Sequence, residues 1–193
     1  MRIHYITAAA LVAVGIVSAA RADDVTDQIS EALKAYQNHD TPTAIAALDA
    51  AANLLRQARA EGFKKLLPPV PPGWTADDPD ATAVGAAMLG GGTTASRTYH
   101  NGPQQVEVQI MADSPMLQGM AALLGSPFAA AGGLKTVVIG GRRMSYAEND
   151  NSYMNLVADK VIVKVEGNKE TPDPTLKSFI GAIDFAAIEK LVH

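Results

Sequence analysis

The spacing of apolar residues changes at one proline-rich segment, Pro68–Trp74, which holds four prolines within five residues. Before this segment apolar residues recur at helical spacing, and after it they alternate as they do in β-strands. Prolines at this density form a stiff, extended spacer. The chain is therefore expected to place a helical segment and a strand-rich domain on either side of a linker at residues 68–74.

Residues 23–67 predict two helices joined by a short turn. Ile29, Leu33 and Tyr36 lie at helical spacing in the first helix, and the sequence His39-Asp40-Thr41-Pro42 interrupts the pattern. Asp40 or Thr41 is expected to cap the second helix, with Pro42 in its first turn. The apolar face of the second helix is expected to consist of Ile45, Leu48, Ala52, Leu55, Ala58 and Ala60.

This predicted hairpin resembles a single tetratricopeptide-type unit, because Tyr36, His39, Asp40, Ala44, Leu48 and Ala51 follow the spacing of that repeat. One such unit cannot bury its own apolar face. The hairpin is therefore expected to pack on the rest of the chain, on a second copy or on a partner.

Residues 75–193 predict an α+β domain. Alternating apolar runs predict strands at 93–100, 105–111, 135–139, 142–147, 153–158 and 160–166. Helical patterns follow at 115–124, 174–183 and 185–191. The strands are separated by hairpin-turn signals such as Asn101-Gly102, and no βαβ crossover is evident. The expected fold is α+β: an antiparallel sheet with helices on one face, preceded by an N-terminal α-helical hairpin.

Residues 1–22 predict a cleavable signal peptide. One basic residue, Arg2, precedes an apolar run, and Ala20-Arg21-Ala22 places small residues before the expected cleavage point. The apolar run is shorter than the ~20 residues of a comfortable membrane span, although an uncleaved N-terminal anchor is an alternative. We expect a periplasmic protein of a Gram-negative bacterium, cleaved after Ala22 and without a membrane span after cleavage.

The charge balance argues against binding to nucleic acid. The chain has 16 Lys and Arg residues against 20 Asp and Glu residues, and removal of the signal peptide takes away Arg2 and Arg21 but no acidic residue. No basic block remains to attract nucleic acid or an anionic membrane. The chain has no cysteine, so disulfides, thiolate metal sites and cysteine nucleophiles are excluded.

Four residues form a candidate soft-metal site. Met116 and Met120 are four residues apart on a predicted helix, Met111 precedes that helix, and His100 lies on a predicted strand. Thioether and imidazole ligands suit copper. The alternative is that these methionines fill the apolar core, as their leucine neighbours suggest.

Arg142 and Arg143 form a second candidate site, because they place two guanidinium groups after the flexible Gly140-Gly141 turn. An anion or an acidic partner surface could dock there, and a hairpin turn with solvated charges is the alternative. No catalytic residues are predicted, since no Gly-x-Ser-x-Gly or phosphate-binding loop motif occurs. No cofactor is expected.

The segment Pro71-Pro72-Gly73-Trp74 and the strand–helix junction Ala112-Asp113-Ser114-Pro115 carry a resemblance at the level of the fold. The order of strands and helices over residues 70–192 resembles the PsbP-like fold, named for an extrinsic protein of photosystem II. It is also similar to exported bacterial proteins with a helical N-terminal segment. The resemblance implies a binding or assembly factor without chemistry of its own.

The sequence therefore predicts a non-enzymatic periplasmic protein that docks on an envelope protein partner, with a homodimer as a further arrangement. The alternative function is a periplasmic carrier of a small ligand or of copper. The expected organisation is a signal peptide at 1–22, a helical hairpin at 23–67, a linker at 68–74 and an α+β domain at 75–193.

Overall fold

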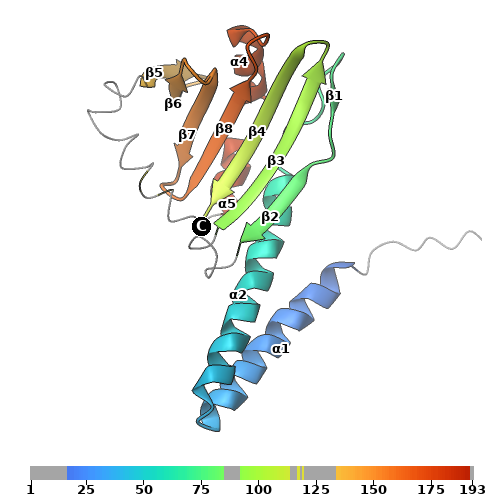
Figure 1. Ribbon diagram of the computed structural model, residues 1–193, viewed down its shortest axis with the longest axis vertical. Coiled ribbons are helices and arrows are strands. Elements are labelled where there is room, and N and C mark those ends of the chain that lie inside the picture. Colours follow the sequence, from blue (N-terminus) through green and yellow to red (C-terminus); the bar gives the residue numbers. More distant parts are fainter. Residues whose placement is uncertain (1–16, 85–91, 114–116, 118, 120–133, 192–193) are drawn as a thin grey trace, which may run out of the picture. The chain divides into compact units, whose positions relative to one another are not determined.

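A computed structural model describes residues 17–84, 92–113, 117, 119 and 134–191 (Figure 1). Contacts divide the chain into two compact units, Met1–Leu54 and Leu55–His193. The boundary between the units falls inside the second helix. The sequence predicted it further along the chain, at the linker of residues 68–74. The reason is that the last turns of that helix contribute Phe63, which is fully buried in the core of the second unit.

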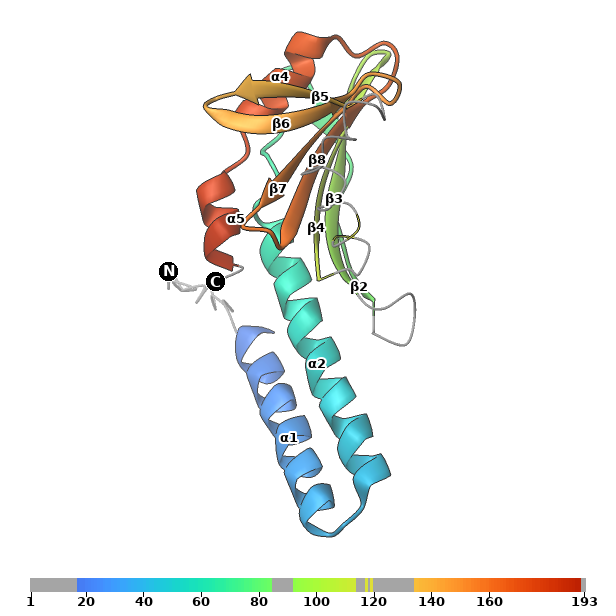
Figure 2. The same ribbon diagram turned by 90° about the vertical axis from the view of Figure 1, so that its left-hand side faces the viewer.

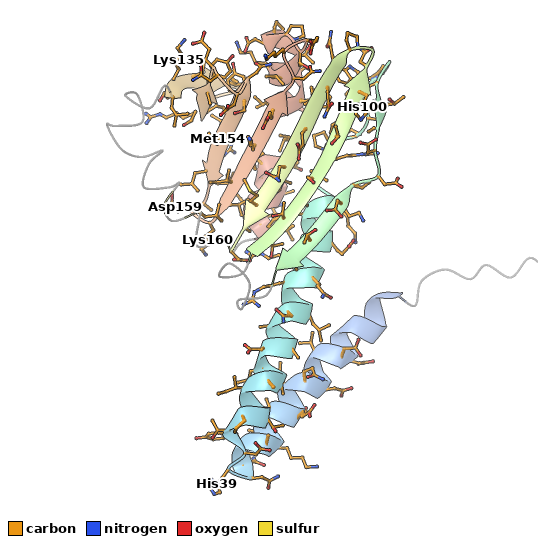
Figure 3. All side chains as sticks on the ribbon, viewed as in Figure 1. His39, His100, Lys135, Met154, Asp159 and Lys160 are labelled. Atoms are coloured by element: carbon orange, nitrogen blue, oxygen red, sulfur yellow. The ribbon has the colours of Figure 1, made fainter. Side chains whose placement is uncertain are left out.

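The first unit is a hairpin of α1 (Val17–Gln37) and the N-terminal part of α2 (Thr41–Lys64). His39 adopts a left-handed backbone conformation with φ of 61° and lies at the tip of the hairpin (Figure 3). The backbone N–H of Asp40 bonds the carbonyl of Ala35 at 2.9 Å. The Asp40 carboxylate accepts the N–H of Thr43 at 3.2 Å, so the predicted cap of the second helix is confirmed.

The second unit is built on an eight-stranded sheet in which every pairing is antiparallel. The strand order is β1-β3-β4-β8-β7-β6-β5, and β2 also pairs with β3. The strands are β1 (Thr75–Ala76), β2 (Asp80–Val84), β3 (Gly92–Asn101), β4 (Gln104–Ala112), β5 (Leu134–Ile139), β6 (Arg142–Ala147), β7 (Ser152–Val157) and β8 (Val161–Gly167). The predicted α+β class with an antiparallel sheet is confirmed.

Two short helices complete the described part of this unit, α4 (Asp173–Gly181) and α5 (Phe185–Leu191). They lie with the last turns of α2 on one side of the sheet (Figure 2). Alternation along β4 turns Val106, Val108 and Ile110 into the core, and all three are fully buried. They pack in one cluster with Phe63, Leu176, Phe179 and Ile188 from the helices.

The β5–β6 hairpin leaves the plane of the sheet and crosses toward α4 (Figure 2). The β6–β7 ladder extends over Ser145–Ala147 of β6, and the preceding residues of β6 diverge from β7. Where the two backbones diverge, the side chain of Asn155 supplies a hydrogen bond, because its Nδ2 donates to the carbonyl of Arg143 at 2.7 Å. A buried amide thus replaces the lost ladder hydrogen bond.

The described sheet differs from the sequence prediction at one edge. Strands β1 and β2 were not predicted; β2 pairs with β3 from Asp80↔Ser96 to Val84↔Gly92. Its small residues give no clear alternation, so pairing with a longer neighbour determines its conformation. Most of the helix predicted at 115–124 lies outside the described residues.

Candidate functional site

The two helices of the hairpin contact each other through alanines. Ala32 and Ala35 of α1 and Ala44, Ala47 and Ala51 of α2 are all buried, with at most 8% of each residue exposed. They recur at intervals of three or four, which places them on one side of each helix. Small side chains let two helices approach closely, and large apolar side chains are not needed in this contact.

The large apolar side chains of the hairpin are left in solvent. Ile29, Leu33 and Tyr36 of α1 are 49%, 57% and 70% exposed, and Ile45 and Leu48 of α2 are 55% and 54% exposed. We call these five residues the hairpin face. Exposed apolar residues scattered singly are ordinary on a protein surface, but a contiguous group marks an interaction site.

Helical geometry places all five residues on the same side of the hairpin. Each residue advances about 100° around a helix. On α1 the exposed apolar residues are rotated by about 90° around the helix axis from the buried alanines, in the direction in which the helix winds from N- to C-terminus. On α2 the rotation from alanines to exposed residues has the same size and the same direction. Because the two helices are antiparallel, equal offsets point toward the same side. The hairpin therefore presents one continuous apolar surface.

The charged residues of α1 lie away from this surface, whereas Asp49 of α2 is exposed four residues after Ile45 and borders it. Asp24, Asp27 and Glu31 are exposed and occupy the opposite side of α1, where their spacing of three and four residues aligns them. From Val25 to Tyr36 on α1, and from Thr41 to Leu55 on α2, no charged residue falls within the angular range of the hairpin face. The face itself is thus suited to apolar packing, and the charge at its border, Asp49, is acidic.

The sequence correctly predicted that these apolar residues share a helical spacing and cannot be buried by the hairpin itself. It did not predict that alanines form the contact between the helices. Periodicity shows which residues share a side of a helix, but the choice of which side packs against the neighbour depends on how closely the two backbones approach. The sequence signal that could have identified the packed side is the recurrence of alanines at intervals of three and four residues.

The structure separates the two arginines of the predicted anion site. Adjacent residues of a strand point to opposite faces, so Arg142 and Arg143 diverge. Arg142 lies 4.4 Å from the ring centre of Phe185, and its Nη1 donates to a carboxylate oxygen of Glu189 at 3.2 Å. Arg143 is exposed. Arg142 therefore ties β6 to α5, and the two guanidinium groups do not form one site.

The described residues of the predicted copper site, His100 and Met111, also lie far apart. His100 pairs in register with Gln105, and Met111 pairs with Thr94, so the two are six residues apart along β3 and about 20 Å from each other. The Nε2 of His100, seen near the end of β3 in Figure 3, lies 3.1 Å from the carboxylate of Asp77. Met116 and Met120 lie outside the described residues. Within the described ranges no group of three or more His, Cys, Asp or Glu side chains could hold a metal ion.

Four buried side-chain polar atoms have no hydrogen-bond partner in the described part of the chain: Arg59 Nε on α2, and three atoms on the sheet, Thr93 Oγ1, Ser152 Oγ and Asn155 Oδ1. Thr93 is on β3, whereas Ser152 and Asn155 are on β7, and β4 and β8 lie between these strands. Strands are spaced about 4.8 Å apart, so three strand intervals place Thr93 at least about 14 Å from the other two. The three atoms therefore do not converge on one ligand position.

The shifted pKa values belong to contacts that hold the second unit together. Burial raises the pKa of Tyr99 to about 12, and its phenol donates to the carbonyl of Pro68. Burial and the hydrogen bond to Asp173 raise the pKa of Tyr153. Hydrogen bonds from Lys177 and then Tyr153 lower the pKa of Asp173. These groups join the linker and α4 to the sheet, which is a structural role.

None of the helices in the described ranges is long and apolar enough to cross a membrane. Comparison with known proteins adds no relative, since no family model, curated protein or solved structure matches this chain. The hairpin face is therefore the candidate functional site that rests on the geometry of this molecule.

Proposed function

We propose that this chain is an exported, non-enzymatic binding protein that docks on a protein partner through the hairpin face. One observation carries the proposal: five large apolar side chains, each about half exposed or more, lie on one side of a two-helix hairpin. Burying side chains of this kind is worth roughly 1 kcal/mol or more apiece, so a complementary apolar surface would bind the hairpin favourably.

The charge of the hairpin favours a protein partner over an anionic surface. Between Asp23 and Leu54 the chain has six acidic residues and one basic residue, Lys34. Nucleic acids and anionic lipid headgroups would be repelled by this balance. An apolar protein surface, such as the exposed stripe of another helical protein, would meet no such penalty. The resemblance to the PsbP-like fold is consistent with a binding role and is itself part of the proposal.

The test compares two double variants that add the same charge to opposite sides of the hairpin. Leu33→Glu with Leu48→Glu places two carboxylates on the hairpin face, and both positions are exposed, so the hairpin can still form. Thr43→Glu with Ala46→Glu adds the same charge to exposed positions on the other side of α2. Both pairs would be expressed with the native N-terminus in the host, followed by chemical cross-linking and mass spectrometry.

We expect the face variant to lose its cross-linked protein products by about tenfold or more, and the control to retain them. Equal products from both variants would contradict a docking role for this face. The mass of the purified protein tests the export prediction in the same material. A chain beginning at Asp23 in the periplasmic fraction supports cleavage after Ala22, whereas a full-length chain retained in the membrane fraction contradicts it.

A further inference from the structure

We infer that the partner of the hairpin face is a second copy of this chain, so that two hairpins form a symmetric four-helix core. This inference rests on the proposed function, because it names the occupant of the same face. A pair of antiparallel helices with one apolar side is half of a four-helix bundle. Two identical halves complete each other about a twofold axis, which is the most frequent symmetry of protein oligomers.

The apolar character of the face permits self-association. In a twofold contact each side chain meets the same surface of the other copy, so any charge on the face would be brought near its own duplicate. No charged residue lies within the hairpin face between Val25 and Tyr36 or between Thr41 and Leu55. The acidic residues Asp24, Asp27 and Glu31 would remain on the outside of such a pair, and Asp49 would lie at the rim of the contact, where it stays in water.

The size of the face meets the requirement of a small dimer. Each of its five side chains exposes roughly 100 Å², because about half or more of each is accessible. A symmetric pair would therefore bury about 1,000 Å² from these residues alone, which reaches the lower limit for a specific interface.

The residue types of the hairpin face also favour packing between two copies of the hairpin. The helices of one hairpin approach through alanines, leaving Leu and Ile residues to fill the space between two hairpins. Leu and Ile at helical spacing are the residues that interdigitate in the cores of helical bundles. Tyr36 can lie at the edge of such a core, with its ring buried and its hydroxyl in water.

The experiment uses the mature protein, residues 23–193, at about 50 µM, a concentration at which a micromolar dimer is largely associated. Light scattering after size exclusion gives the mass of the wild type, of Leu33→Glu with Leu48→Glu, and of Thr43→Glu with Ala46→Glu. A second readout uses the absence of cysteine: Asn38→Cys in the exposed turn accepts one dye per chain, and energy transfer between mixed donor and acceptor samples reports pairing.

We expect twice the chain mass for the wild type and the control, one chain mass for the face variant, and energy transfer lost only in the face variant. A monomeric wild type without energy transfer would overturn the inference. If the face variant nevertheless lost its cross-linked host proteins, the proposed function would stand and the occupant would be another protein. A monomer whose host cross-links are unchanged by the face variant would overturn both.

Discussion

The phenol of Tyr99 donates a hydrogen bond of 2.6 Å to the carbonyl of Pro68, which joins the central sheet to the first residue of the proline-rich linker. Tyr99 is fully buried, and its ring lies 4.8 Å from that of Phe179. Phe179 in turn contacts the ring of Trp74 at 5.1 Å in an edge-on arrangement. The linker is thus held by one hydrogen bond and one aromatic cluster.

Replacing Tyr99 by Phe should destabilise the protein by about 1–3 kcal/mol, because the carbonyl of Pro68 would lose its buried donor while the ring contacts remain. Urea unfolding followed by tryptophan fluorescence measures the change, since Trp74 is the only tryptophan. Tyr36→Phe is the control, because Tyr36 is 70% exposed and its loss of a hydroxyl should change the free energy of unfolding by less than about 0.5 kcal/mol. Equal effects would refute the role of the hydrogen bond.

The same residue predicts a loss of stability in alkali. The folded chain holds the Tyr99 proton with a pKa of about 12, and the unfolded chain holds it with a pKa near 10. Between these values the unfolded chain releases the proton first, so the free energy of unfolding should fall as pH rises above 10. Below pH 10 this residue should contribute no pH dependence. Tyr99→Phe should make the decline from pH 10 to 12 shallower, and an unchanged slope would count against the assignment.

Arg142 and Arg143 provide a matched pair for separating structure from binding. Arg142→Ala should cost about 1–2 kcal/mol of stability, because it removes both the ion pair with Glu189 and the contact with the ring of Phe185. Arg143→Ala should change stability by less than about 0.5 kcal/mol, since its side chain is exposed. Thermal unfolding measures both. A destabilisation by Arg143→Ala as large as that by Arg142→Ala would show that the assignment of Arg142 to the β6–α5 contact is wrong.

Much of the sheet could be predicted from the sequence because alternation encodes its buried face. The alternating run at 105–111 predicts a strand with one apolar face, and Val106, Val108 and Ile110 of that face are fully buried. The predicted hairpin was also found. Contacts between distant segments could not be predicted: Arg59 Nη1 lies 2.6 Å from the carboxylate of Asp113, across 54 residues of sequence. Such pairs depend on how helices pack on the sheet, which local periodicity does not encode.

The candidate sites illustrate the same limit. Arg142 and Arg143 are neighbours in sequence, but the strand turns them to opposite faces. His100 and Met111 both lie on paired strands, yet the register separates them along the sheet. The exposed hairpin residues could be recognised from spacing alone, whereas the identity of the packed side required the positions of both helices. Sequence adjacency was therefore a weaker guide to a site than the periodicity of whole elements.

Gly167 should not tolerate a side chain. A Cβ atom at this position would lie 2.8 Å from the Cβ of Thr171 and 2.9 Å from a methyl carbon of Leu176, closer than packed carbon atoms approach. Gly167→Ala should therefore destabilise the protein by about 1–3 kcal/mol. Gly181→Ala is the control, since a Cβ there meets no atom within 4 Å and should be neutral or slightly stabilising. Chemical denaturation of both variants measures the difference, and equal stabilities would contradict the predicted close contact.

The alanine contact inside the hairpin can be tested at adjacent positions of α2. Ala47 is 5% exposed and lies against α1, whereas its neighbour Ala46 is exposed. Ala47→Leu should push the helices apart and cost about 1–3 kcal/mol, while Ala46→Leu should change stability by less than about 0.5 kcal/mol. Amide hydrogen exchange of residues 26–50 reports the hairpin separately from the sheet unit. We expect faster exchange in Ala47→Leu alone. The reason is that the buried side chains among the described residues of the hairpin are all alanines of this contact. Equal exchange in both variants would mean that the helices do not depend on close approach, and the large side chains of the hairpin face would then have to be reconsidered as the contact between them.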